Sequence, residues 1–469
     1  MSRRARAWPV SAVVISCSLL VTRSALAFQP VGVSGHTQDV VRGPGGELLF
    51  VWTSGGAKSA AVNIGKLDEA SGKVVGGGEI ATGIDAWFGR PLLAVSPSGA
   101  HVQTVWNRDI PGSDHGRIEI AARQSGGNWT VSTVIEQGDP WHYTQPSVAV
   151  RDDGSSHVAY QQWPTQGSGE YTVYTWRSAG GSFTTPVQVS GNGGRDVAMA
   201  VDHAGGLHLR YSRGYRYAPP GKTLDQIPNL AMPKLPGSSD GPFFGDLFLD
   251  SADTVHLVFD DCVDCSASGT HAIGHTTIPL GGSSFATPTR ASGDPFSGED
   301  PWPAVGVDAK GTVYVMWCPS TSTTSECKLS IRVAGSGAWS EKTLDAQAGM
   351  GRATKPTVLV TSSAVYGFWR TGSGEIVMEE LSALIPSADA GPPEPDAAAD
   401  GSIDAPIIAP GDGGADAGPG PSAEGGTEAA DEGCACSAPG RRQRSSVWWV
   451  AVLAGVLATP RRRRAAGAR

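Results

Sequence analysis

Several side chains that could bind a ligand stand just before short apolar runs of this sequence. Arginine forms paired hydrogen bonds with carboxylates, and aromatic faces can stack on sugar rings. If the runs converge, we expect a concavity for a carbohydrate or an acidic ligand; the open alternative is a solvated funnel with polar walls. The candidates are Arg90, Trp141, His142, Tyr143, Arg195, Asp300, Trp302 and Arg352, with Asp39, Asp196 and Lys355 in similar places.

A long polar segment, residues 212–241, adds Tyr215 and Arg216 to these candidates. Segments of this length without regular structure are usually functional or disordered in a compact domain. The aromatic and basic content favours function, so we expect a long loop on the face that carries the other candidates.

The elements that position these side chains are repeats. Alternating strands that end in an aromatic residue recur about every 53 residues, and each is preceded by an apolar run and followed by a third strand and a Gly-aromatic turn. Four-stranded units at this spacing predict an all-β fold, a seven-bladed β-propeller over residues 28–385, with six blades as the alternative. The apolar runs are then the innermost strands. The closing aromatics are Trp52, Trp106, Tyr160, Tyr211, Phe259, Trp317 and Trp369.

The start of this region predicts how the propeller closes. "PVGVSG" at residues 30–35 repeats the pattern of "PVQVSG" at residues 186–191, which is the fourth strand of its unit. The last unit has a third strand, "EIVMEEL" at residues 375–381, but no fourth strand after it. We therefore expect the N-terminal segment to complete the last blade and remove an open sheet edge.

Cysteine and histidine positions favour structural roles over a metal site. Cys262, Cys265, Cys318 and Cys327 suit disulfides in an exported chain, either as two local pairs or as bridges between neighbouring units. His157, His208 and His256 share one repeat position on separate units, so we interpret them as strand residues, and the Asp/Gly motifs before them as turns. We expect neither a metal nor another cofactor.

The chain ends predict export. Arginines, a short apolar run and "SALA" ending at Ala27 are typical of a secretory signal peptide over residues 1–27. A lipoprotein cysteine at Cys17 is the alternative. Residues 386–433 are rich in Pro, Ala, Gly and Asp and lack Lys, Arg and aromatic residues, which predicts a disordered acidic stalk.

Residues 434–469 carry Cys434 and Cys436, an apolar stretch at 447–459 and an arginine cluster at 461–464. The stretch is too short for an ordinary spanning helix. This tail resembles the myxobacterial C-terminal sorting signal (MYXO-CTERM), which implies cleavage near the cysteines by a sorting protease and display at the outer cell surface. A plain short membrane anchor is the alternative.

The repeats resemble the sialidase-like (BNR-repeat) propeller superfamily. Remnants of its Asp-box are "GGNWT" ending at Thr130, "GGSFT" at Thr184 and "GSGAWS" at Ser340, all without the Ser and Asp of the motif. The resemblance implies an arginine triad for a substrate carboxylate, for which Arg90, Arg195 and Arg352 are the candidates. No Tyr-Glu pair can be assigned for catalysis.

Our leading interpretation is an exported, surface-anchored propeller that binds a glycan or a protein through its loop face without catalysis. The alternatives are a sialidase-like glycoside hydrolase or polysaccharide lyase using the axial mouth, and a structural surface module. The net charge of −9 argues against nucleic acid as a partner.

Overall fold

The computed structural model describes residues 28–55, 59–84, 90–109, 116–124, 127–136, 141–164, 169–264, 269–297, 301–319, 326–346 and 355–385. The signal-peptide, stalk and sorting predictions, and the calls on Asp300, Arg352 and Cys265, therefore lie outside the described residues. In the part that is described, no helix is both long and apolar enough to cross a membrane.

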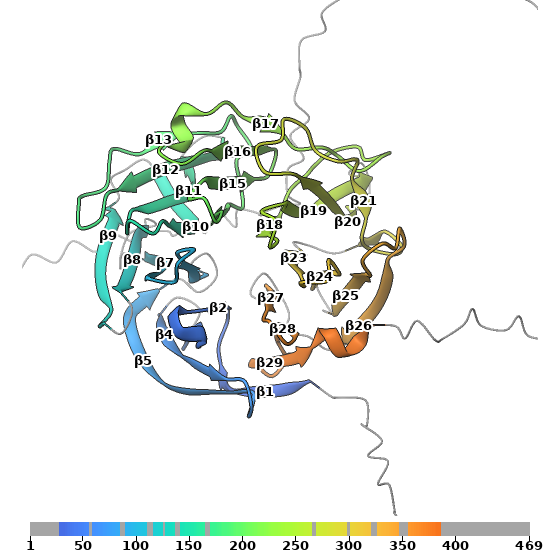
Figure 1. The fold of residues 1–469 in the computed structure, drawn as a ribbon, viewed down its shortest axis with the longest axis horizontal. Helices are drawn as coiled ribbons and strands as arrows, with labels where there is room; N and C mark the ends of the chain where they lie inside the picture. Colours follow the sequence, from blue (N-terminus) through green and yellow to red (C-terminus); the bar gives the residue numbers. More distant parts are fainter. Residues whose placement is uncertain are drawn as a thin grey trace, which may run out of the picture. The chain divides into compact units, whose positions relative to one another are not determined.

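Consecutive antiparallel strands form the fold, and they are grouped into sheets that radiate from a common centre (Figure 1). Three sheets follow the chain directly, each pairing its first strand with its second, the second with the third and the third with the fourth. Their strands are β10 (Trp141–Val150), β11 (Ser156–Pro164), β12 (Tyr171–Arg177) and β13 (Val187–Gln188); β14 (Ala198–Val201), β15 (Leu207–Tyr211), β16 (Gly214–Ala218) and β17 (Leu230–Ala231); and β23 (Ala304–Val307), β24 (Val313–Trp317), β25 (Cys327–Arg332) and β26 (Ser340–Asp345).

Two further sheets vary this plan. In one, a fifth strand also pairs with the third strand; its members are β18 (Gly245–Leu249), β19 (Val255–Asp264), β20 (Thr270–Ile278), β21 (Thr289–Arg290) and β22 (Phe296–Ser297). In the other, two repeats join into an eight-stranded sheet through the pair Ile84–Arg108. Its strands are β2 (Gln38–Arg42), β3 (Leu48–Ser54), β4 (Ala60–Asp68), β5 (Lys73–Ile84), β6 (Leu92–Val95), β7 (His101–Asp109), β8 (Gly116–Gln124) and β9 (Thr130–Ile135).

The last sheet joins the two ends of the repeat region. Its order is β1 (Gln29–Ser34), β29 (Glu375–Glu380), β28 (Val365–Arg370) and β27 (Thr357–Val360). Pro30 lies opposite Val377, and Ser34 lies opposite Glu375. The predicted pairing of the N-terminal segment with "EIVMEEL" is thus confirmed, and Figure 1 shows β1 at the outer edge of this sheet.

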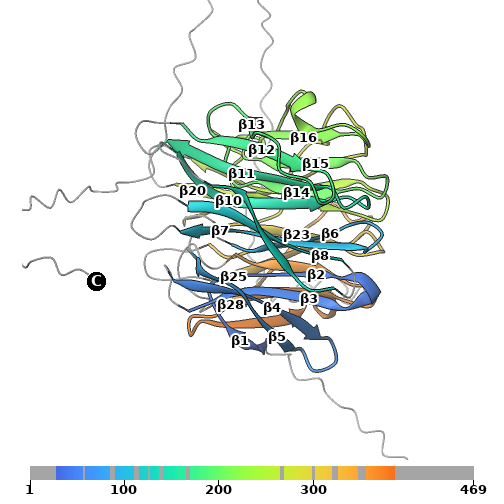
Figure 2. The same ribbon diagram turned by 90° about the vertical axis from the view of Figure 1, so that its left-hand side faces the viewer.

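The first strand of each repeat lies at the centre. β2, β6, β10, β14, β18, β23 and β27 contact one another in that order, and β27 contacts β2 (Figures 1 and 2). Apolar side chains fill the spaces between neighbouring sheets, and the closing aromatics Trp106, Trp317 and Trp369 are fully buried there. This is a β-propeller, with a continuous apolar interface between adjacent sheets and polar first-strand ends around the axis.

The histidines at one repeat position are structural, as predicted. His208 is fully buried, with Nδ1 at 2.7 Å from the Tyr215 hydroxyl and Nε2 at 3.3 Å from Asp202, whose other oxygen accepts the amide of Gly206. The turn carboxylate therefore ties the turn between the first two strands to the second strand.

The same arrangement recurs in other units. Asp250 contacts His256 in this way, and Asp308 accepts a hydrogen bond from the hydroxyl of Tyr314. In the third unit the Ser155 hydroxyl contacts His157 and takes the place of the turn carboxylate.

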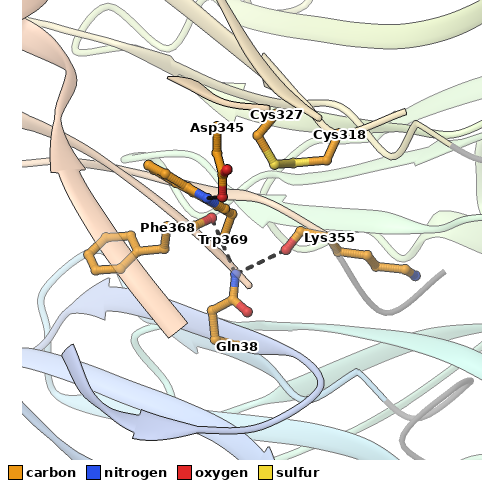
Figure 3. Close-up of a disulfide and its surroundings, with 7 residues drawn as sticks. All are labelled: Gln38, Cys318, Cys327, Asp345, Lys355, Phe368 and Trp369. Carbon is orange, nitrogen blue, oxygen red and sulfur yellow. Dashed lines mark hydrogen bonds between the residues drawn. A yellow bond between two sulfur atoms is a disulfide. The ribbon is translucent and has the colours of Figure 1, made fainter. Parts of the chain in front are cut away.

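A disulfide joins Cys318, just after β24, to Cys327 at the start of β25 (Figure 3). It confirms the local pairing predicted for these two cysteines. Cys262 is also disulfide-bonded.

Candidate functional site

Equivalent residues of the first strands form the axial site. The first strands can be aligned on one residue each. This alignment residue pairs with the second-strand residue that stands four positions before the closing aromatic, as Val95 pairs with Val102 and Val307 with Val313. The residue five positions before each alignment residue differs in chemistry from repeat to repeat. These residues are Thr37, Arg90, Gln145, Asp196, Phe244, Trp302 and Lys355, which we call the axial ring.

The first strands enclose a cavity of about 330 Å³. Five members of the axial ring line it, together with polar residues that stand two positions after a ring position. The ring members are Arg90, Gln145, Asp196, Trp302 and Lys355, and the further residues are Asp39, Ser147, Asp246 and Thr357. Cations, carboxyls, an amide and an indole therefore share one enclosed space on the axis.

The axial ring departs from ordinary backbone geometry. Gln145, Asp196 and Trp302 have φ angles of 50°, 48° and 44°, in the left-handed region that residues other than glycine seldom occupy. Such conformations cost free energy and concentrate at binding and catalytic sites. Three repeats adopt this geometry at one position, and in each the residue lines the cavity.

Side chains two positions after the ring position tie neighbouring first strands together. The Asp39 carboxylate accepts the amide of Leu93 on β6 at 2.8 Å, and the Ser147 hydroxyl accepts that of Met199 on β14 at 3.0 Å. Asp246 accepts the equivalent amide of Val305 on β23. Two carboxyls and one hydroxyl thus perform the same structural task.

Burial changes the acidity of the two carboxyls. Desolvation raises the pKa of Asp39 to about 6, although the positive charge of Arg90 and the amides of Leu93 and Val40 lower it. Desolvation likewise raises the pKa of Asp246, opposed first by Arg90. The charge of Asp246 also raises the pKa of Asp39, and Arg90 lowers the pKa of both carboxyls, so Asp39, Asp246 and Arg90 form one electrostatic unit.

Arg90 and Lys355 connect different repeats around the cavity, and Arg90 reaches past β2 to β27. Arg90 Nη2 donates to Thr357 Oγ1 at 3.0 Å and to Pro356 O at 3.4 Å on the β27 side of the ring. Lys355 Nζ lies 3.1 Å from the centroid of the Trp302 ring, a cation–π contact. Gln38 Nε2 donates to the carbonyls of Lys355 and Phe368, which fixes the Lys355 backbone (Figure 3).

A buried charge network supports the opposite side of the cavity. Arg210, which is fully buried, donates to Asp196 Oδ2 at 2.9 Å. Asp260 is also fully buried and contacts His271 Nδ1 at 2.9 Å. Burial lowers the pKa of Arg210, whereas burial raises that of Asp260. The network holds Asp196 just before β14 and neutralises part of its charge.

Most of the remaining sequence candidates lie outside the cavity lining. Trp141 and His142 make edge contacts with Tyr171 and Trp163 on the same sheet, and Tyr143 is buried against Tyr160. Arg195 pairs with Glu170. Of the candidate arginine triad, only Arg90 is described on the cavity wall.

The expected long loop after β15 is wrong. Only Ser212 and Arg213 separate β15 from β16, so Tyr215 and Arg216 are strand residues. Tyr215 is buried and contacts His208, and Arg216 donates to the carbonyls of Leu224 and Ile227. The alternating aromatic pattern "YRY" marks a short hairpin strand, and the extra residues follow it.

Asp246 and Gln145 were not among the candidates drawn from the sequence. A signal for Asp246 exists, because Asp39 and Asp246 each stand thirteen residues before a closing aromatic, Trp52 and Phe259. Gln145 stands two residues after the candidate Tyr143 and directly before Pro146 of β10.

No known family matches the sequence, and no curated protein matches it. Solved structures with related chain paths include an α-L-arabinanase of Penicillium chrysogenum complexed with arabinobiose, with 13% identity, 76% of this chain and 98% of that chain covered, and a TM-score of 0.47.

The polysaccharide lyase Uly1 shows 12% identity over 74% of this chain and 89% of its own, with a TM-score of 0.42. A protein of unknown function from Dyadobacter fermentans shows 12% identity over 62% and 94%, with a TM-score of 0.40. We take no residue role and no activity from these proteins.

Proposed function

We propose that this protein cleaves a glycosidic carbohydrate in the axial cavity. The observation that carries the proposal is the shared repeat position of Asp39, Ser147 and Asp246. Ser147 links its strand to the next with a hydroxyl alone. Placing a carboxyl there raises the pKa of Asp39 to about 6, which corresponds to a cost of about 3 kcal/mol for the ionised form. The structural contact does not require that cost, so it supports a chemical role for the two carboxyls.

The proposed reaction uses one carboxyl as an acid and the other as a base. Asp39 donates its proton to the glycosidic oxygen as the bond from that oxygen to the anomeric carbon breaks. A water molecule adds to the anomeric carbon and gives its proton to the Asp246 carboxylate. Coupled carboxyls favour a state with one proton between them, which is the state this reaction needs.

Binding without cleavage is the second candidate. Both oxygens of Asp39 accept backbone amides, from Val40 at 2.9 Å and Leu93 at 2.8 Å. These contacts support a structural carboxyl beside a bound glycan. Under this alternative the aromatic and cationic members of the axial ring would hold the ligand.

The test is a cleavage and binding screen of the full chain with neutral and acidic oligosaccharides between pH 4 and 8. We expect release of reducing ends, and a loss of at least about 100-fold in rate for Asp39→Asn with binding retained. Asp294→Asn is the matched control, because Asp294 is exposed. Binding without release would support the second candidate, and full activity of Asp39→Asn would exclude the acid role.

We also propose seven blades, counting the eight-stranded sheet as two. The closed series of first-strand contacts supports this count, whereas counting by sheet gives six. We also propose that this propeller is related to the sialidase-like superfamily.

Export and surface display are proposed from the sequence of the chain ends. We expect signal removal after Ala27, an acidic stalk over 386–433 and processing near Cys434 or Cys436 by a sorting protease. Mass spectrometry of the surface-released protein checks this, and retention of Arg461–Arg464 would contradict it.

A further inference from the structure

Two buried donors on the cavity wall lack an acceptor. Within the described residues, Arg90 Nε and Trp302 Nε1 are both buried and have no hydrogen-bond partner. Trp302 as a whole is only 6% exposed. An unsatisfied buried donor costs free energy comparable to a lost hydrogen bond. Two such donors on one cavity wall indicate that the cavity is shaped for an acceptor that a ligand brings.

The two donors belong to one continuous arc. Arg90 reaches β27 through its contacts with Pro356 and Thr357, and Pro356 directly follows Lys355. Lys355 in turn places its ammonium group over the face of Trp302. The arc therefore presents a guanidinium, an ammonium and an indole N–H in succession. Arginine, lysine and indole groups are all donors and have no acceptor atom.

The carboxyls of the cavity have hydrogen-bond partners of their own, although the charge of Arg90 also lowers the pKa of Asp39 and Asp246. Asp39 and Asp246 accept amides of neighbouring strands, and Asp196 is paired with Arg210. In the contacts above, Arg90 donates through Nη2 to neutral oxygens only, so its Nε–H remains as a donor for an anion.

We propose that the arc of Arg90, Lys355 and Trp302 is a subsite for an anionic oxygen group, a carboxylate or sulfate, carried by the sugar. The inference rests on the proposed carbohydrate function and names its substrate class as acidic glycans. The Trp302 ring packs against Phe244, with the ring centroids 4.2 Å apart, and this contact holds the indole in place on the cavity wall.

The test compares ligands that differ only in charge. Calorimetric titration of the full chain would use a uronic acid tetramer, its methyl ester, a sulfated neutral tetramer and sodium sulfate. We expect the acid or the sulfated tetramer to bind at least about 10-fold more tightly than the ester, as for one charge-assisted hydrogen bond. The tetramer that binds more tightly identifies the anion, and sodium sulfate shows whether the sugar is needed.

Two variants locate the effect. Trp302→Phe keeps an aromatic ring but removes the indole donor, and Arg90→Gln removes the guanidinium. Each should lower affinity for the acidic tetramer by about 10-fold and leave the ester unchanged. Arg195→Gln is the matched control, because Arg195 pairs with Glu170 and does not line the cavity.

The outcomes separate this inference from the proposed function. Equal affinity for the acid and its ester would overturn the anionic subsite even if a variant failed to fold, because that comparison needs only the natural chain. Cleavage of a neutral glycan in the same screen would then leave the proposed function standing. Binding of the acid without any cleavage would support the subsite and reject hydrolysis.

Discussion

Asp39 serves both the fold and the proposed chemistry, and its protonation should be visible in stability. Because the folded state raises the pKa of Asp39 from 3.8 to about 6, folding favours the protonated carboxyl. The stabilisation of the folded state by protonated Asp39 is complete below pH 4 and is lost as the pH rises to 6. The loss in unfolding free energy is about 3 kcal/mol at most. Asp39→Asn should flatten that part of the curve of unfolding free energy against pH.

Urea unfolding at intervals of half a pH unit between 3.5 and 7 measures this slope. Asp294→Asn, at an exposed position, should keep the natural slope. An unchanged slope in Asp39→Asn would show that the Asp39 carboxyl is not the source.

A second residue should act in the opposite direction. Burial lowers the pKa of His157 to about 3, so the folded state holds this imidazole neutral. The stabilisation of the folded state by neutral His157 is complete above pH 6.5 and is lost as the pH falls towards 3. Between pH 6.5 and 5 the unfolding free energy falls by about 2 kcal/mol. His157→Gln should remove that acid-side loss in the same titration, whereas His203→Gln, at an exposed position, should retain it.

At the scale of the element, the turn carboxylate is the unit to test. Asp308 Oδ1 accepts the amides of Lys310 and Thr312, both at 2.9 Å, and Oδ2 accepts the hydroxyl of Tyr314 at 3.2 Å. Asp308→Ala leaves these donors without that acceptor, and we expect a loss of about 2 to 3 kcal/mol in unfolding free energy.

Asp308→Asn keeps one acceptor oxygen and should lose about half as much. Thermal and urea unfolding together check the ranking. Equal losses for the two variants would mean that the hydrogen bonds to the turn are not what Asp308 contributes.

The elements were predictable because their signals are local. Alternating apolar residues and a closing aromatic such as Trp106 define a strand within a few residues, and repetition turns the strand into a unit. The site was only partly predictable. Arg90 and Trp302 follow from their place before an apolar run, but the role of Asp246 depends on the amide of Val305 in another unit. The prediction that Tyr215 lies in a long loop was wrong because a tight hairpin and a long loop carry similar polar and aromatic residues.

At the scale of the whole molecule, the ring depends on β1. Val31 is fully buried in the cluster that also contains Phe50, Phe368 and Met378. Val31→Asp would bury a carboxylate there, and we expect a loss of more than about 3 kcal/mol in unfolding free energy. Val75→Asp is the control, because Val75 is 48% exposed on β5, and it should change stability by less than about 0.5 kcal/mol.

Calorimetry of the two variants measures both losses, and protease sensitivity near residue 380 shows where the sheet opens. A Val31→Asp protein as stable as the natural chain would mean that the pairing of β1 with β29 adds little to the ring.

The pairing of β1 with β29 also sets an order of events during synthesis. Pro30 and Val377 are neighbours in one sheet although about 350 residues separate them along the chain. The first segment of the propeller must therefore wait for the last one, and the interfaces of β2 and β27 stay open until then. Contacts between such distant segments form slowly, so the unfinished chain exposes an unpaired strand edge for most of its assembly. Until the final strand arrives, that edge is open to pairing with other chains.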